Sequence, residues 1–236
     1  MLGYYRIAGL LVKMDTFGRT LTQSMPYSVG EIDLPDVILH SFGREIMELH
    51  PNTDPDLAEY LGTGVAFYKE LIRFQGMMLH SSAVVVDGKA YLFTASSGTG
   101  KSTHTKLWLQ AFGERAYILN DDKPALRKID GQWFAFGTPW SGKHDISANI
   151  GVPVGGIAIL ERGERNEICR ASGTDVLLDL LRQVNRPRGA EYRRLLMPLL
   201  DQLLREVPIW RLKCNMEPEA AIVAYEAMSG EKFKEN

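Results

Sequence analysis

Cysteine is scarce in this chain of 236 residues, where Cys169 and Cys214 are the only two. They lie far apart and form no C-x-x-C pair, which argues against a disulfide framework and against a cysteine zinc site. Long hydrophobic runs are also lacking, because the apolar stretch near the N-terminus covers only residues 7–12. It is too short for a signal peptide or a membrane span. The sequence therefore predicts a cytoplasmic, soluble protein with two reduced thiols.

A strong excess of charge is absent as well, since the formal net charge is -2. No broad basic field is expected to attract nucleic acid or an anionic membrane, so neither is predicted as a partner. The hydrophobic fraction of 45% is close to the globular average and supplies an ordinary core. The length allows one main domain with a smaller N-terminal part.

We expect residues 1–75 to form an N-terminal segment with strands and helices, which packs on a core made by residues 76–236. In the N-terminal segment, residues 4–14 and residues 20–27 are rich in β-branched and aromatic side chains and favour strands. Gly18 lies near a turn between them.

Hydrophobic periodicity and turn residues place the remaining elements. We predict strands at residues 83–86, 89–93, 116–119, 133–136 and 156–160, and helices at residues 56–74, 101–112, 176–184, 192–204 and 220–228. Asp87-Gly88 between the first two strands is a strong hairpin signal. Gly62 and Gly64 leave open whether the first helix is one helix or two.

The most informative segment is a glycine-rich turn at residues 95–103, between a predicted strand and a helix that opens with Lys-Ser. Glycines allow successive backbone N–H groups to point at phosphate oxygens, and the helix N-terminus adds its dipole. The spacing predicts ATP and Mg²⁺ as cofactors, with the lysine on the β- and γ-phosphates and the serine hydroxyl on the metal. The predicted nucleotide-binding residues are Ser97, Gly98, Thr99, Gly100, Lys101, Ser102 and Thr103.

One position departs from the usual phosphate-loop pattern, because Ala95 stands where the first glycine is expected. Alanine is tolerated there only if the backbone keeps a negative φ. The alternative interpretation of the segment is a glycine-rich turn that caps a helix and binds nothing.

Asp121 and Asp122 follow a predicted strand about twenty residues beyond the loop lysine. Two adjacent carboxylates suit two tasks, one holding metal and one accepting the proton of an incoming hydroxyl. His80 precedes the hairpin, and it lies at the same end of the sheet only if the hairpin geometry places it there.

Leu79-His80-Ser81-Ser82-Ala83, the hairpin, the phosphate loop and Asp121-Asp122 together resemble the HPr kinase/phosphorylase and phosphoenolpyruvate carboxykinase superfamily, over residues 76–123. The resemblance implies an α/β (α+β, mixed-sheet) phosphate-loop core, with a β-rich N-terminal part and a helical C-terminal third. It also implies Asp121 as the catalytic base and Asp122 as a metal ligand, beside the Ser102 hydroxyl that the loop pattern already places on the metal. For His80 it leaves two roles open, a neighbour that assists the base, as in HPr kinases, or a metal ligand, as in carboxykinases.

The arginine motif of the carboxykinases and the signature that follows the aspartate pair in HPr kinases are both missing. Instead, residues 137–144 read Gly-Thr-Pro-Trp-Ser-Gly-Lys-His and are followed by Asn149. This resembles small stand-alone relatives of HPr kinase, some associated with phosphorylation of serine in ribosomally made peptides. Lys143 is suited to stabilise charge on the transferring phosphoryl group. A structural loop around a packed Trp140 is an equal alternative.

The predicted function is transfer of the γ-phosphoryl group of ATP to a serine hydroxyl of a protein or peptide. Two alternatives stay open, a kinase for a small hydroxylated metabolite and a nucleotide-binding regulatory module without turnover. The resemblance leaves open whether the protein forms homo-oligomers. An arginine-rich stretch (Arg182, Arg186, Arg188, Arg193 and Arg194) is interpreted as a solvated face, with a docking surface for an acidic peptide as the alternative.

Overall fold

The computed structural model of the protein describes residues 2–31 and 34–234 and arranges them around two β-sheets, with four and nine strands. The strands are β1 (Leu2–Ile7), β2 (Leu10–Asp15), β3 (Ser28–Val29), β4 (Val37–Leu39), β5 (Gly76–Met78), β6 (Ser81–Val86), β7 (Lys89–Thr94), β8 (Ala116–Asn120), β9 (Ala125–Ile129), β10 (Gln132–Phe136), β11 (Gly151–Arg162), β12 (Glu167–Arg170) and β13 (Ile209–Cys214). The helices are α1 (Gly18–Ser24), α2 (Gly43–Leu49), α3 (Pro55–Leu71), α4 (Lys101–Phe112), α5 (Gly173–Gln183), α6 (Ala190–Glu206) and α7 (Glu219–Ser229).

The large sheet has the order β5-β9-β10-β11-β7-β6-β8, and β13 pairs with β11 and β12 beside this path. Strand β11 runs parallel to β7 and to β13, whereas β6, β8, β9 and β10 form antiparallel pairs. The small sheet has the order β3-β1-β2-β4. The expectation of a mixed α/β fold is therefore confirmed. No described helix is long and apolar enough to cross a membrane.

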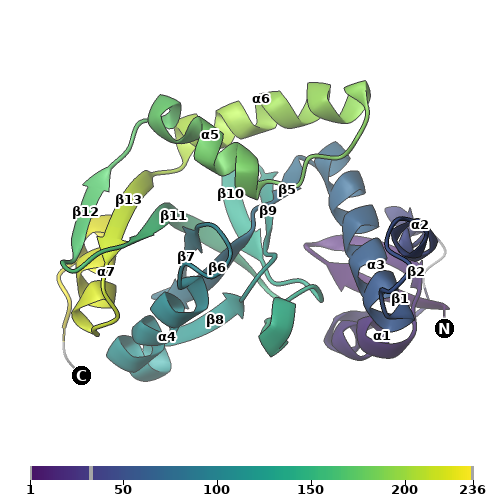
Figure 1. Ribbon diagram of the computed structural model, residues 1–236, viewed down its shortest axis with the longest axis horizontal. Coiled ribbons are helices and arrows are strands. Elements are labelled where there is room, and N and C mark those ends of the chain that lie inside the picture. The colour runs from purple at the N-terminus through teal and green to yellow at the C-terminus, as the bar shows by residue number, and fades with distance from the viewer. Residues whose placement is uncertain (1, 32–33, 235–236) are drawn as a thin grey trace.

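Helices cover both faces of the large sheet (Figure 1): α5 and α6 lie on one face, and α4 and α7 lie on the other. The alternation along β6 shows how the sequence achieves this, because every residue of this strand is buried. Ala83 and Val85 belong to the cluster under α5 and α6, and Val84 and Val86 belong to the cluster under α4 and α7. A strand that is apolar on both faces is typical of a sheet between two helical layers.

The four-stranded sheet ends at Leu39, and the large sheet begins at Gly76. Helix α3 connects them and packs beside the small sheet, as Figure 1 shows. The predicted division of the chain between residues 75 and 76 stays a prediction, and its outer limits at residues 1 and 236 lie outside the described residues.

Two predictions for the N-terminal segment are wrong. Residues 4–14 form two strands rather than one, because Ala8 and Gly9 both take positive φ angles and close a tight hairpin. Residues 20–27 form most of α1 and a 3₁₀ turn instead of a strand. Asp56 on α3 accepts a hydrogen bond of 2.8 Å from the backbone N–H of Arg19, so a distant side chain satisfies the first turn of α1.

Residues 55–71 form one continuous helix despite two glycines, which settles the question of one helix or two. The glycines allow close packing: a Cβ on Gly62 would lie 2.7 Å from the carbonyl carbon of Phe42, and one on Gly64 would lie 2.9 Å from the Trp140 ring. Backbone atoms move aside only at a high cost in free energy, so a side chain is tolerated less well at Gly62 than at Gly64.

Gly62→Ala is therefore expected to lower the free energy of unfolding by about 2 kcal/mol, since overpacking against backbone costs more than the helix gains. Helix propensity alone predicts the opposite, a gain of about 1 kcal/mol. Urea denaturation measures the difference, and Gly30→Ala is the control because a Cβ there meets nothing within 4 Å. A stabilised Gly62→Ala protein would contradict this packing argument.

Glu59 is an ionisable side chain of α3 that is only 5% exposed. Thr20 donates a hydrogen bond to one carboxylate oxygen, and the other oxygen has no partner among the described residues. Burial raises the pKa of Glu59 from 4.5 to about 7, although the Thr20 hydrogen bond opposes the shift. The folded protein therefore holds this proton more tightly than the unfolded chain.

Because the folded-state pKa is the higher one, stability is expected to fall as pH rises from 5 to 8, by about 2 kcal/mol. Glu59→Gln should remove this slope and should be more stable than the wild type at pH 8. Urea denaturation across this pH range measures it, with Glu48→Gln on the exposed face of α2 as control. An unchanged slope in Glu59→Gln would assign the pH dependence to other groups.

Candidate active site

Three segments that the sequence singles out meet at one end of the large sheet. Strand β7 ends at Thr94, which pairs with Ser81 at the start of β6, and β8 ends at Asn120, which pairs with Ala83. The Thr94 hydroxyl donates a hydrogen bond of 2.8 Å to the carbonyl of His80. The hairpin therefore places His80 between the phosphate loop, which follows β7, and the aspartate pair, which follows β8.

The loop between β7 and α4 depends on two glycines for its backbone conformation. Gly98 and Gly100 have φ angles of 79° and 123°, which side-chain-bearing residues rarely adopt. A Cβ on either glycine would meet no atom within 4 Å, so both face open space. Ala95 does not have a positive φ and is buried in the core, so alanine is compatible with the first loop position.

Lys101 opens α4 and turns its side chain back into the loop. Its ammonium donates a hydrogen bond of 3.0 Å to the carbonyl of Ala95, and the residue is only 8% exposed. Burial lowers the pKa of Lys101, while the charges of Asp122 and Asp121 oppose this shift. Ser102 and Thr103 follow in the first turn, half-buried and exposed.

Arg162, at the end of β11, is a loop-holding residue that sequence reasoning missed. Its guanidinium donates hydrogen bonds to the carbonyls of Thr99, at 3.1 Å, and Gly98, at 2.5 Å. These two hydrogen bonds tie the loop to the end of β11. Only the parallel register of β11 with β7, in which Ile159 pairs with Thr94, brings Arg162 to the loop.

A cavity of about 500 Å³ lies between the loop and the ends of β11 and β13. Its lining residues are Gly98, Thr99, Gly100, Thr103, His104, Leu107, Leu160, Glu161, Arg162, Gly163, Cys214, Asn215 and Met216. This size and its largely apolar lining are typical of small-molecule sites. The imidazole of His104 is structural: burial lowers its pKa to about 3, and its Nε2 accepts a hydrogen bond from the Trp108 indole.

Asp121 is buried beside the first turns of α4. Its Oδ1 accepts a hydrogen bond of 2.7 Å from the Ser82 hydroxyl, which is also 2.9 Å from the Thr105 hydroxyl of α4. This chain of contacts fixes the Asp121 carboxylate relative to the helix that carries Lys101.

Asp122 is the more accessible carboxylate and contacts two basic side chains. Its Oδ1 lies 3.1 Å from Nε2 of His80, and its Oδ2 is bonded to the Lys123 ammonium. Burial by itself would raise the pKa of Asp122, but the hydrogen bonds and charges of His80 and Lys123 outweigh it and lower the pKa to about 2. Asp122 is therefore ionised at neutral pH, and its weak basicity suits a metal ligand better than a general base.

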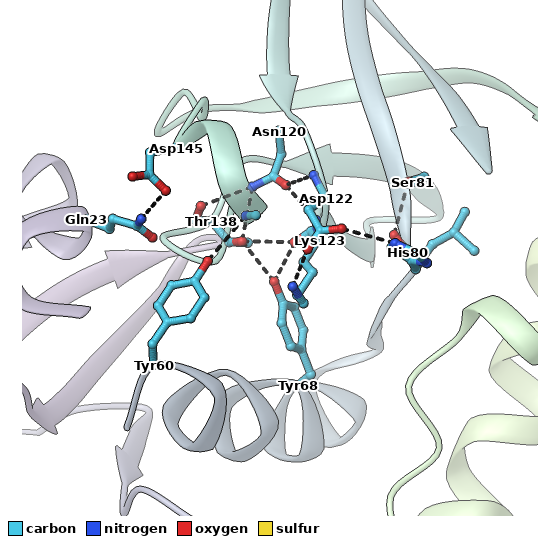
Figure 2. Close-up of polar contacts among 12 residues, drawn as sticks. Gln23, Tyr60, Tyr68, His80, Ser81, Asn120, Asp122, Lys123, Thr138 and Asp145 are labelled. Atoms are coloured by element: carbon cyan, nitrogen blue, oxygen red, sulfur yellow. Dashed lines mark hydrogen bonds and ion pairs between the residues drawn. The ribbon is translucent and has the colours of Figure 1, made fainter. Parts of the chain in front are cut away.

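Polar side chains on either side of the segment that carries the carboxylates hold its backbone in place (Figure 2). Asn120 Oδ1 accepts hydrogen bonds from the backbone N–H groups of Asp122, at 3.0 Å, and Lys123, at 2.7 Å. The Thr138 hydroxyl, 2.8 Å from the Tyr68 hydroxyl, donates to the carbonyl of Lys123. The α3 helix of the N-terminal segment thus supports the site.

Lys143 lies in a loop that reaches the aspartate pair from the other side. A Cβ on the neighbouring Gly142 would lie 2.7 Å from the Asp122 Cβ, so the two segments touch. The Lys143 side chain is exposed and forms no hydrogen bond or ion pair with the described residues. Trp140 is buried against Phe67, which supports the structural interpretation of this loop without deciding the role of Lys143.

His80 is also tied to the end of α5. Its Nδ1 lies 2.9 Å from Oε1 of Gln183, and its backbone N–H donates to the Gln183 carbonyl at 2.8 Å. A second, open cavity of about 480 Å³ surrounds this contact. It is lined by Met78, His80, Asp122, Lys123, Arg182, Gln183, Val184, Asn185 and Arg186. Arg182 and Arg186 therefore line a cavity beside Asp122. Both belong to the arginine-rich stretch that the sequence analysis interpreted as a solvated face.

Among the described residues, no group of three or more His, Cys, Asp or Glu side chains forms a metal site. The donors fit a magnesium ion that arrives with a nucleotide, since such an ion takes one or two protein ligands and completes its shell with phosphates and water. Ser102 and Asp122 are the residues of this chain that suit that arrangement.

No family model matches the sequence, and no curated protein matches it. Among solved structures, the fold is similar to the Hpr(Ser) kinase/phosphatase from Coxiella burnetii. The two chains share 11% sequence identity, and the match covers 64% of this chain and 92% of the other at a TM-score of 0.36.

Proposed function

We propose that the protein is an ATP-dependent kinase that transfers the γ-phosphoryl group to a serine hydroxyl of a protein or peptide. The observation that carries the proposal is the position of Lys101. Its ammonium is buried at the start of α4, behind a glycine-rich turn between a strand and a helix, and donates a hydrogen bond to the carbonyl of Ala95. A turn that only caps a helix gains nothing from a buried ammonium, because burying a charge costs free energy.

Each residue of the site has a proposed task. The backbone N–H groups of residues 97–103 and the Lys101 ammonium bind the phosphates, and Ser102 and Asp122 hold Mg²⁺. The metal, when bound, neutralises charge on the transferring phosphoryl group. Asp121 accepts the proton of the attacking hydroxyl, His80 orients Asp122, and Lys143 supplies a further positive charge.

The two cavities on either side of this centre fit the two substrates. The cavity of about 500 Å³ beside the loop suits a nucleoside, and the cavity of about 480 Å³ beside His80 and Asp122 suits an acceptor. The second cavity is open to solvent over a broad area, which favours a peptide segment over a small metabolite that needs to be enclosed.

The test combines calorimetry of MgATP binding with a transfer assay that uses ATP labelled at the γ-phosphorus. Acceptors are a serine-centred peptide library and, in parallel, a panel of hydroxylated metabolites. Transfer of the label to peptides supports the proposal. Transfer to metabolites alone would mean that the acceptor is a small metabolite and not a peptide. Tight MgATP binding without any transfer would make the protein a regulatory module, and no nucleotide binding would leave residues 95–103 as a helix-capping turn.

A further inference from the structure

Arg182 and Arg186 lie at the end of α5, beside the proposed acceptor cavity. Arg182 also lines a cavity of about 330 Å³ on the phosphate-loop side, together with Thr94, Ala95 and Ser96. It therefore stands between the loop and the carboxylates. The end of α5 is fixed here, because Gln183 contacts His80 and Leu79 forms a β-bridge with Val184.

Neither guanidinium has a close carboxylate partner among the described residues. Arg182 is 71% exposed, and its ion pair with Asp179 is 3.9 Å long, while Asp179 makes a shorter pair of 2.7 Å with Arg211. Arg186 is exposed and has no hydrogen bond or ion pair among the described residues. Asp122 is the one carboxylate among the residues that line the cavity, and His80 and Lys123 already contact it. The acceptor cavity therefore has an excess of positive charge.

A separate apolar hollow of about 80 Å³ adjoins the cavity on its α3 side. Met78, Lys123 and Asn185 line both spaces, and Leu61, Val65 and Trp140 are among the other residues of the hollow. Figure 2 shows Lys123 and Asp122 between α3 and the strand that begins beyond His80. An acceptor that reaches Asp122 thus meets positive charge on the α5 side and a small apolar space on the α3 side.

From this arrangement we infer that the acceptor is a peptide segment with an acidic side chain on one side of its serine and a small apolar side chain on the other, and that Arg182 and Arg186 select it. Guanidinium groups bind carboxylates through paired, charge-assisted hydrogen bonds, which gives the recognition its strength. The inference rests on the proposed kinase function and adds the class of substrate to it.

A first experiment compares phosphorylation of serine-centred peptides with Asp or Glu, with Asn or Gln, and with Lys at the flanking positions. The wild type should prefer the acidic peptides, and Arg182→Gln and Arg186→Gln should each reduce kcat/KM for them about tenfold. Arg186→Glu should shift the preference towards lysine-containing peptides. Arg188→Gln is the matched control, because Arg188 belongs to the same exposed stretch and lines neither cavity. Equal use of acidic and neutral peptides would overturn the inference.

A second experiment measures binding without chemistry, by fluorescence anisotropy of a labelled acidic peptide and its amide counterpart. If the acidic peptide binds through Arg186 but no phosphoryl transfer occurs, the two arginines do bind acidic peptides and the kinase function is contradicted. If transfer occurs without discrimination in either assay, the kinase function stands and the inference fails. If the protein neither transfers phosphate nor binds the acidic peptide preferentially, both are wrong.

Discussion

Replacing Lys101 with alanine is expected to weaken MgATP binding by about a hundredfold, which corresponds to about 3 kcal/mol. The reason lies in the position of the ammonium, which is buried and donates a hydrogen bond to the Ala95 carbonyl, where the proposed function has it bind the phosphates. Charge-assisted hydrogen bonds from a buried ammonium to phosphate are stronger than those on an open surface.

The same substitution should leave the fold intact, so that the loss of binding is not confused with unfolding. Lys101 has no direct ion pair, and burial disfavours its charged form, so its removal also removes a desolvation cost. We expect the free energy of unfolding to change by no more than about 1 kcal/mol. Calorimetry with Lys106→Ala as control measures the effect, because Lys106 lies exposed on the same helix. If Lys101→Ala and Lys106→Ala bind MgATP equally well, residues 95–103 are not a phosphate site.

The sequence predicted those parts of the site whose signals are local. The Asp87-Gly88 hairpin, the loop glycines and the helix from Lys101 to Phe112 depend on neighbours within a few residues, and all three have the expected structure. The sequence also predicted that alanine is acceptable at position 95 if its φ angle is not positive, and the structure meets this condition.

The parts that the sequence could not predict depend on contacts between distant segments. Arg162 reaches the loop only through the parallel register of β11 with β7, and Arg182 reaches it only because α5 returns over the sheet. Residues 20–27 contain β-branched side chains, but contacts with Asp56 and Glu59 on α3 favour a helix there. Tertiary contacts outweigh weak local propensities in such segments.

Asp121→Asn is expected to reduce phosphoryl transfer by a factor of about 100 to 10,000, with MgATP binding changed by less than about threefold. Asparagine has nearly the same shape, and its carbonyl oxygen still accepts the hydrogen bond from Ser82. It cannot accept a proton at neutral pH. The loss should therefore appear in kcat rather than in the KM for MgATP.

The neighbouring carboxylate supplies the matched control for this prediction. Asp122→Asn should raise the Mg²⁺ concentration required for half-maximal activity, because Asp122 is held ionised by His80 and Lys123 and its pKa of about 2 leaves it a poor proton acceptor. Transfer from MgATP to the best library peptide, and the slower transfer to water, measure both variants across a range of Mg²⁺ concentrations. If Asp122→Asn abolishes kcat at saturating Mg²⁺ while Asp121→Asn retains it, the base is Asp122 and the two carboxylates exchange their proposed tasks.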